Sequence, residues 1–236
     1  MILDAFKLQT AIIQIQYTEA FELWDRSGAI SRRICEIWPG LTLAEANPHQ
    51  QILIGKNVNI QTNFTRSTVT LSGEKSLAQR KIDQVDKTFK VWREFLDLDE
   101  LIRVSMRVTY SKEFPSMKEA NAELLALNLA RWPNTKVFDQ PIESDLNGLE
   151  IHYHFEDENS FSVLKIKSEQ IKYEVDLDPY FVEESEIRKT MNRMVIDFDR
   201  GLLGSVSAEK LRIDDWIKGF QHVLRRDIEK VIKGLV

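Results

Sequence analysis

Residues 101–110 read Leu-Ile-Arg-Val-Ser-Met-Arg-Val-Thr-Tyr, and this stretch decides the fold. Apolar and polar side chains alternate along it, which is the period-2 pattern of a half-buried β-strand. The pattern predicts one face with Ile102, Val104, Met106 and Val108, and an opposite face with Arg103, Ser105, Arg107 and Thr109. A strand with one polar face is typical of an antiparallel sheet that helices cover on one side.

The residues before this strand predict strands and helices in turn. The expected helices carry apolar side chains on one face, and Phe21, Trp24 and Ile30 begin this face in the first helix. Proline and glycine then end that helix. In chain order we expect a strand at 11–17, a helix ending at Pro39-Gly40, strands at 51–54 and 58–71 joined by Gly55-Lys56-Asn57, and a helix at 76–98.

The residues after this strand repeat the same order of elements. We expect a helix at 116–131 ending at Trp132-Pro133-Asn134, strands at 149–155, 161–176 and 192–198, and a helix at 207–235. Residues 134–148 have no strong period and predict a long connection. The segment Gly201-Leu-Leu-Gly204 is predicted to link the last strand to the last helix.

The two halves predict an internal duplication. Tyr17 and Phe21 precede the first helix as Tyr110 and Phe114 precede the third, and both helices end at Trp-Pro. The predicted fold class is therefore α+β, with two related β-α-β-β-α type repeats and long helices packed on a mainly antiparallel sheet. The predicted repeats are residues 1–100 and residues 101–236, the second with an extra strand and a C-terminal helix. They are expected to form one compact unit, on one shared sheet or two abutting sheets. The alternative is that Trp-Pro is a common helix stop and occurs twice by chance.

Composition excludes several classes of protein. The chain has 236 residues, 43% of them hydrophobic, and a net charge of −5, which excludes a strongly basic nucleic-acid binder of the usual kind. A single cysteine, Cys35, permits no internal disulfide, and no apolar run reaches the ~18 residues of a membrane-spanning helix. The expected location is the cytoplasm, without secretion or membrane insertion.

One candidate metal site combines two predicted strands. His152 and His154 have strand spacing, so both imidazoles point to one face, and Asp197 and Asp199 do the same on a later strand. If the two strands were neighbours, these four side chains could bind zinc, iron or manganese as a divalent cofactor.

The alternative for the histidines is a solvated sheet face. If Phe155 pairs near Ser162, the histidines face Lys165 and Lys167, and the charges pair across strands. The alternative for Asp197 and Asp199 is that they hold the turn expected at Arg200-Gly201. No catalytic residue is assigned.

A candidate ligand site lies on the polar face of residues 101–110. Arg103 and Arg107 point the same way and could bind an anion, with Arg131 and Lys136 as further cations. Aromatic side chains between them are not expected, so base stacking is not indicated and nucleic acid is not favoured. An ion-paired sheet face, or a docking site for an acidic protein, is the alternative.

Other catalytic patterns are absent from the sequence. It has no nucleophile elbow and no phosphate-binding glycine loop, and Cys35 lies beside Ile34 and Ile37 as a small core residue would.

Two short segments suggest a family. Arg103-Val-Ser-Met-Arg107 in a strand, and Val195-Ile-Asp-Phe-Asp199 before a long C-terminal helix, resemble a sporadically distributed bacterial protein family of similar length and no established activity. The chain departs from that family at Val108, where the family tends to place tyrosine. The resemblance implies a stand-alone bacterial protein of a variable gene island, such as those for antiphage defence or toxin immunity.

Three functions follow as hypotheses. The first is a non-enzymatic binding, adaptor or regulatory protein of a bacterial cytoplasmic system, with a protein partner or a second copy of the chain. The second is a metal-dependent enzyme acting on nucleotides or nucleic acid at His152, His154, Asp197 and Asp199. The third is a small-ligand or nucleotide sensor that uses Arg103 and Arg107 in a cleft between the repeats.

Overall fold

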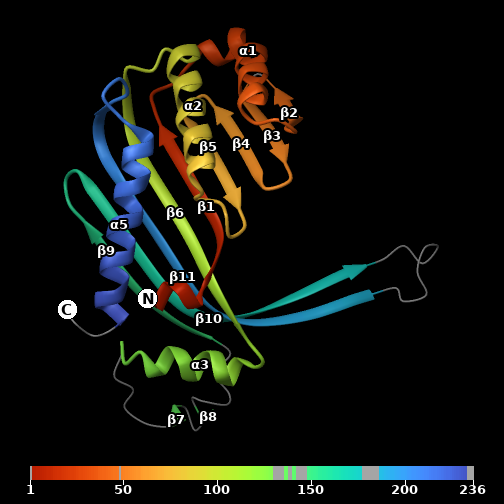
Figure 1. Ribbon diagram of the computed structural model, residues 1–236, viewed down its shortest axis with the longest axis vertical. Coiled ribbons are helices and arrows are strands. Elements are labelled where there is room, and N and C mark those ends of the chain that lie inside the picture. The colour runs from red at the N-terminus through yellow and green to blue at the C-terminus, as the bar shows by residue number, and fades with distance from the viewer. Residues whose placement is uncertain are drawn as a thin grey trace.

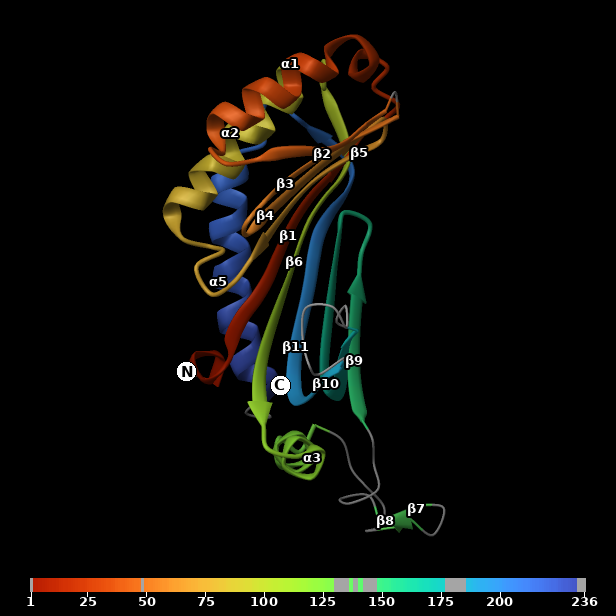
Figure 2. The same ribbon diagram turned by 90° about the vertical axis from the view of Figure 1, so that its right-hand side faces the viewer.

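One large sheet organises the molecule. The computed structural model describes residues 2–47, 49–129, 136–137, 140–141, 148–176 and 186–232. The sheet has nine strands in the order β2-β3-β4-β5-β1-β6-β11-β10-β9, and all neighbouring strands are antiparallel. Helices α1, α2 and α5 cover one face of this sheet, and none of the described helices covers the opposite face, which we call the open face (Figures 1 and 2). The predicted α+β class with a mainly antiparallel sheet is confirmed, and both halves of the chain contribute to the same sheet.

The first half of the chain forms one side of the sheet. Its elements are η1 (Ile2–Ala5), β1 (Lys7–Gln16), α1 (Glu22–Ile37), β2 (Thr42–Asn47), β3 (Gln50–Gly55), β4 (Val58–Asn63), β5 (Arg66–Ser72) and α2 (Gln79–Phe95). The hairpin predicted at Gly55-Lys56-Asn57 is confirmed. The single strand predicted at 58–71 is wrong: the chain turns at Phe64, where the Asn63 Oδ1 atom accepts a hydrogen bond of 3.0 Å from the Thr65 amide.

The second half forms the other side. Its elements are β6 (Glu100–Phe114), α3 (Met117–Ala126), β9 (Leu149–Glu156), β10 (Ser160–Asp176), β11 (Glu186–Ser207) and α5 (Ile213–Ile232), with a separate small sheet of β7 (Lys136–Val137) and β8 (Gln140–Pro141). Helix α3 packs against β6, β10 and β11, and its Asn121 contacts Ser168 in the middle of β10. The prediction for Gly201-Leu-Leu-Gly204 is wrong, because these residues lie within β11 rather than in a connection. The large sheet takes five strands from the first half and four from the second, and the small sheet takes β7 and β8 from the second.

Some predictions lie outside the described residues. These are Arg131, the helix stop at Trp132-Pro133-Asn134 and most of the connection at 134–148.

The core lies between the helices and the covered face of the sheet. Strands β1, β5 and β6 place every second side chain there, and Ile13, Val69 and Met106 lie side by side in one row. Two buried indoles keep hydrogen-bond partners: Trp38 Nε1 donates to Thr88 Oγ1 at 2.8 Å, and Trp92 Nε1 donates to Thr62 Oγ1 at 2.9 Å. These bonds join the end of α1 to α2, and α2 to the sheet. Because hydrogen bonds are directional, they fix the positions of the helices more closely than apolar packing alone would.

Three predicted core positions are wrong. Phe21 and Trp24 are each 52% exposed, because α1 begins only at Glu22 and buries Leu23 rather than its neighbours in the first turn. Ile102 is 50% exposed while Leu101 is buried, because the pairing of β6 with β11 shifts register beside it, and a shift of register interrupts the alternation of faces.

Strands β10 and β11 continue past the rest of the sheet. Residues 171–176 and 186–191 pair only with each other among the described residues, and Figure 1 shows them as a two-stranded arm that points away from the helices. Within the described part of the chain, no helix is long and apolar enough to cross a membrane.

Candidate functional site

The open face of the sheet carries the predicted site residues. Because neighbouring antiparallel residues point to the same face, one row of side chains crosses the sheet from Asn59 to His154. The row contains Asn59, Thr70, Ile12, Arg107, Asp199, Val163 and His154. The face is polar because the apolar positions of each strand are used by the core behind it.

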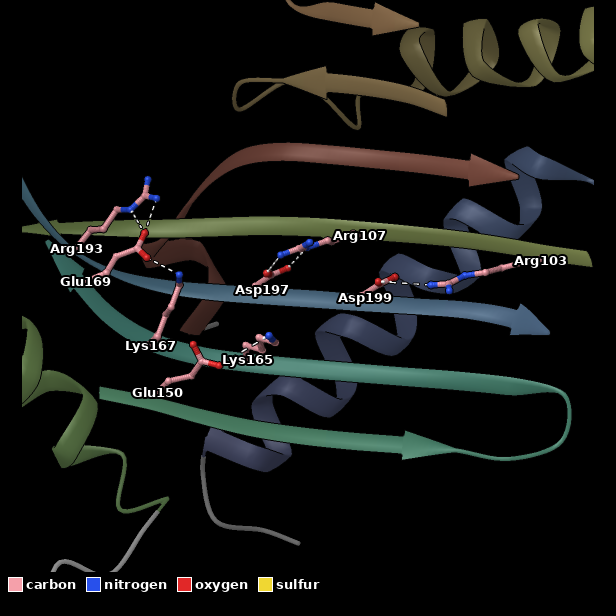
Figure 3. A network of polar contacts seen from close by, with 9 residues as sticks. All are labelled: Arg103, Arg107, Glu150, Lys165, Lys167, Glu169, Arg193, Asp197 and Asp199. Carbon is pink, nitrogen blue, oxygen red and sulfur yellow. Dashed lines mark hydrogen bonds and ion pairs between the residues drawn. The ribbon is translucent and has the colours of Figure 1, made fainter. Parts of the chain in front are cut away.

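Arg107 and Asp197 form a bidentate ion pair on this face (Figure 3). Arg107 Nε donates to Asp197 Oδ1 at 2.8 Å, and Arg107 Nη2 donates to Asp197 Oδ2. Asp197 is only 7% exposed, whereas about half of the Arg107 side chain is exposed. The hydrogen bonds to Asp197 raise the pKa of Arg107 above its ordinary value, although burial opposes the shift. The carboxylate is therefore held by a partner that lies above it, toward solvent.

Arg103 and Asp199 form a second, looser pair beside it. Arg103 Nη2 lies 3.9 Å from Asp199 Oδ2, and the Arg103 guanidinium lies 4.2 Å from the centroid of the Phe161 ring. Burial raises the pKa of Asp199, and the attraction of Arg103 and Arg107 does not outweigh it. The expectation that no aromatic side chain lies near these arginines is wrong, because β10 places Phe161 on this face. The sequence could have shown this, since Phe161 lies an even number of positions from Lys165 and Lys167 and therefore shares their face of β10.

A third group of charges continues the ion pairs toward the edge strand. Arg193 Nε donates to Glu169 Oε1 at 2.8 Å, Lys167 also pairs with Glu169, and Lys165 Nζ lies 3.8 Å from Glu150 Oε1 (Figure 3). Burial would raise the pKa of Glu169, but the hydrogen bonds from Lys167 and Arg193 outweigh it and lower the pKa. We name this set of nine side chains the charged face, as labelled in Figure 3. It holds five cations and four carboxylates, and each carboxylate is paired with at least one cation.

The predicted anion site is thus occupied by the chain's own carboxylates. Arg103 and Arg107 lie on the same face, as expected, but each already pairs with an aspartate of β11. An anionic ligand would have to displace Asp199 or Asp197. Of the two further predicted cations, Arg131 lies outside the described residues, and the side chain of Lys136 is likewise not described.

The four residues of the predicted metal site are not brought together. Strand β10 lies between β9 and β11, so Lys165 separates His152 from Asp197, and Val163 separates His154 from Asp199. Among the described residues, no group of three or more His, Cys, Asp or Glu side chains could hold a metal ion.

The predicted pairing of Phe155 with Ser162 is confirmed, and it turns the histidines toward the lysines of β10. His152 and His154 stack with ring centroids 6.4 Å apart, and His154 Nε2 lies 3.2 Å from Glu156 Oε2.

A second candidate site lies at the start of α1. The rings of Phe21, Trp24, Phe64 and His49 form a cluster, with centroids 5.4 Å apart for Trp24 and Phe64 and 5.7 Å apart for Phe21 and Trp24. We name these four residues the aromatic surface. Two backbone hydrogen bonds hold the β4–β5 turn against the connection from β1 to α1. The amide of Tyr17 donates to the Thr65 oxygen at 3.0 Å, and the amide of Ala20 donates to the Phe64 oxygen at 2.8 Å.

Two hollows lie beside the aromatic surface. One is a groove of about 860 Å³ that Phe21, Ile102, Tyr17 and Arg66 help to line. The other is a cleft of about 550 Å³ whose lining includes five carboxylates. The two share Thr18 and Glu19, so they lie on either side of the connection from β1 to α1.

Sequence reasoning missed the aromatic surface because it assigned Phe21 and Trp24 to the core and left Phe64 inside a strand. One signal was present: the apolar side chains change from even positions (Val58, Ile60 and Phe64) to odd positions (Val69 and Leu71), and Asn63, a residue type that favours turns, precedes this change.

Comparisons with known proteins do not add a function. No protein-family model matches the chain, and no curated protein matches it either. Among solved structures, "Structure of crystal form I of TP0453" is similar over 86% of this chain and 91% of that chain, at 11% sequence identity and a TM-score of 0.16. A similarity of this size carries no inference. The resemblance to a bacterial family stays a prediction.

Proposed function

We propose that this chain is a non-enzymatic binding protein, of the adaptor or regulatory kind, that holds a partner protein at the aromatic surface. The supporting observation is the exposure of Phe21 and Trp24, each 52% exposed and in contact with Phe64. Large aromatic side chains in contact with water lack the free energy that burial would give, and aromatic side chains carry a large share of the binding energy of protein interfaces. Their use as an interface explains both their size and their position.

The charged face is a weaker basis for a function. A sensor of anions at Arg103 and Arg107 would have to break their pairs with Asp199 and Asp197, one of which is buried. A metal-dependent enzyme would have to bring together residues that β10 separates. Paired charges of this kind stabilise a solvated sheet face.

Site-specific cross-linking in the source cells tests the proposal. We place p-benzoylphenylalanine at Trp24, and at Tyr173 as a control, because Tyr173 is also an exposed aromatic side chain but lies on the arm. The expected result is a discrete protein adduct from position 24 that Phe21→Ser removes. No adduct, or the same adduct from both positions, would contradict the proposal. An adduct with a second copy of the chain would assign the surface to self-association instead.

A shared origin of the two halves is a separate proposal. The order of elements supports it: each half runs strand, helix, strands, helix, and the first strands of the halves, β1 and β6, are neighbours at the centre. Outward from that centre the first half adds β5, β4 and β3, and the second adds β11, β10 and β9. In each half, the strand next to the central one is therefore the last of that half in the chain, and the strands farther out come earlier in the chain.

The cellular setting is proposed from the family resemblance alone. It places the binding role in a bacterial cytoplasmic system, such as antiphage defence or toxin immunity. A gene for the cross-linked partner next to the gene for this chain would support it, and a partner with a general cellular role would count against it.

A further inference from the structure

We infer that the partner contributes a basic segment with an apolar anchor, and that this segment lies along the β1–α1 connection between the aromatic surface and the neighbouring carboxylates. The inference rests on the proposed function, since it names the chemistry of the partner at the same surface. Three observations carry it: the charge of the cleft, the positions of its carboxylates and its continuity with the aromatic surface.

The cleft is strongly acidic. Its lining includes the carboxylates of Glu19, Glu22, Asp97, Asp99 and Glu100, and it includes no lysine, arginine or histidine. Within the described part of the chain, none of these five carboxylates takes part in an ion pair. The cation closest in sequence to α1's first turn, Arg26, donates instead to the backbone oxygen of Phe95. This differs from the charged face, where every carboxylate has a cation as its partner.

Local structure explains only part of these charges. Glu22 lies in the first turn of α1, where the helix dipole favours a negative charge. Asp97 has a φ of +52°, which aspartate tolerates better than most residues, but it follows the C-terminal end of α2, where the dipole disfavours a negative charge. Asp99 and Glu100 add charges of the same sign within three residues. An acidic group placed against the dipole fits a role in attracting a positively charged partner.

The cleft and the aromatic surface form one continuous region. Glu19 lines both the cleft and the groove, and Phe21 lines the groove and belongs to the aromatic surface. Ile102 adds an exposed aliphatic side chain to the same groove. A segment that places an apolar side chain against Phe21 and Ile102 would therefore carry its neighbouring side chains past the carboxylates. Lysine or arginine at those positions would complement the charge.

Fluorescence anisotropy with three labelled peptides tests the inference. The first alternates lysine and arginine with leucine and phenylalanine, the second replaces its cations with glutamate, and the third replaces its apolar residues with serine. We expect the basic apolar peptide to bind most tightly at low ionic strength, and to bind more weakly as salt is added. Equal binding of the acidic peptide, or of the basic peptide without apolar residues, would overturn the inference.

Variants locate the binding. Asp97→Asn with Glu100→Gln should weaken binding of the basic apolar peptide about threefold to tenfold, because two exposed charges are lost. Asparagine tolerates the left-handed backbone at position 97, so folding is retained. The matched control, Glu113→Gln with Glu158→Gln, removes the same charge from exposed positions elsewhere and should leave the affinity unchanged. An equal loss in the control would show non-specific attraction and overturn the inference.

Trp24→Ser separates this inference from the proposed function. This substitution should lower the affinity for the basic apolar peptide about tenfold or more, since aromatic side chains carry a large share of the binding energy of an interface. If the basic and the acidic peptide with apolar residues both bind, and both need Trp24, then the partner's basic character is wrong while the aromatic surface remains a binding site. If no peptide binds, the inference fails, and the cross-linking at position 24 decides the proposed function independently.

Discussion

Arg103 stacks on Phe161 although the two residues lie on strands that are not neighbours. The guanidinium lies 4.2 Å from the ring centroid, and β11 runs between β6 and β10. The contact is possible because the residue of β11 that pairs with Phe161 is Gly201. Without a side chain at that position, the Phe161 ring lies over the strand and meets the arginine on its far side. The glycine is therefore a structural part of the charged face.

Gly201→Ala should destabilise the protein. An added Cβ would overlap the Phe161 ring and lie 2.7 Å from the backbone oxygen of Val104, so the strands must move apart. Overpacking of this kind costs about 1–3 kcal/mol. The control is Gly219→Ala in α5, where a Cβ meets nothing within 4 Å and alanine favours the helix by about 0.5–1 kcal/mol. Urea denaturation of both variants measures the two effects, and equal effects would contradict the explanation.

Breaking the Arg107–Asp197 pair from one side should cost more than replacing both partners. Arg107→Ala leaves the buried Asp197 carboxylate without its two hydrogen bonds, at a cost of about 1–3 kcal/mol. Replacing both residues with leucine removes the buried charge as well, so the double variant should be more stable than Arg107→Ala. Thermal unfolding of the single and double variants compares them. A double variant less stable than the single one would mean that the pair itself contributes most of the energy.

Adding zinc or manganese in equimolar amount should leave the melting temperature unchanged. Lys165 lies between His152 and Asp197, and its positive charge opposes a cation at that place. His154 has Glu156 as its partner, which leaves at most a weak site on the edge strand. Thermal-shift measurements with and without each metal test this. A rise in melting temperature that His152→Ala with His154→Ala removes would restore the metal site.

The fold could be predicted from sequence where a single period governs a segment. Polar and apolar side chains alternate from Arg103 to Thr109, and Val104, Met106 and Val108 are all buried as the alternation requires. The prediction fails where a local irregularity competes with the period. The register shift beside Ile102 reverses one position, and the turn at Phe64 divides the segment 58–71 that is predicted as one strand.

The contacts in the candidate sites depend on which strands are neighbours in the sheet, and the alternation along a strand does not predict its neighbours. The faces of Arg103, Arg107, Asp197 and Asp199 were predicted correctly from alternation. Their partners were not, because residues in β6 and β11 are about ninety positions apart in the chain yet pair directly. The aromatic surface was missed because Phe21 and Trp24 were assigned to the core and Phe64 to the middle of a strand. Phe64 meets Trp24 only because the β4–β5 turn lies against the start of α1.

Glu169→Gln should change how stability depends on pH. The pKa of Glu169 is lowered in the folded protein, where Lys167 and Arg193 hold its carboxylate against the effect of burial. A carboxyl group with a lowered folded pKa stabilises the protein above its unfolded pKa, and this contribution disappears as the pH falls through the folded pKa. The wild-type protein should therefore be more stable than the variant at pH 7, and the difference should shrink below about pH 5. Denaturation between pH 3 and pH 7 measures it, with Glu158→Gln as the matched exposed control. A difference between wild type and Glu169→Gln that stays constant with pH would mean that the side chain acts through packing alone.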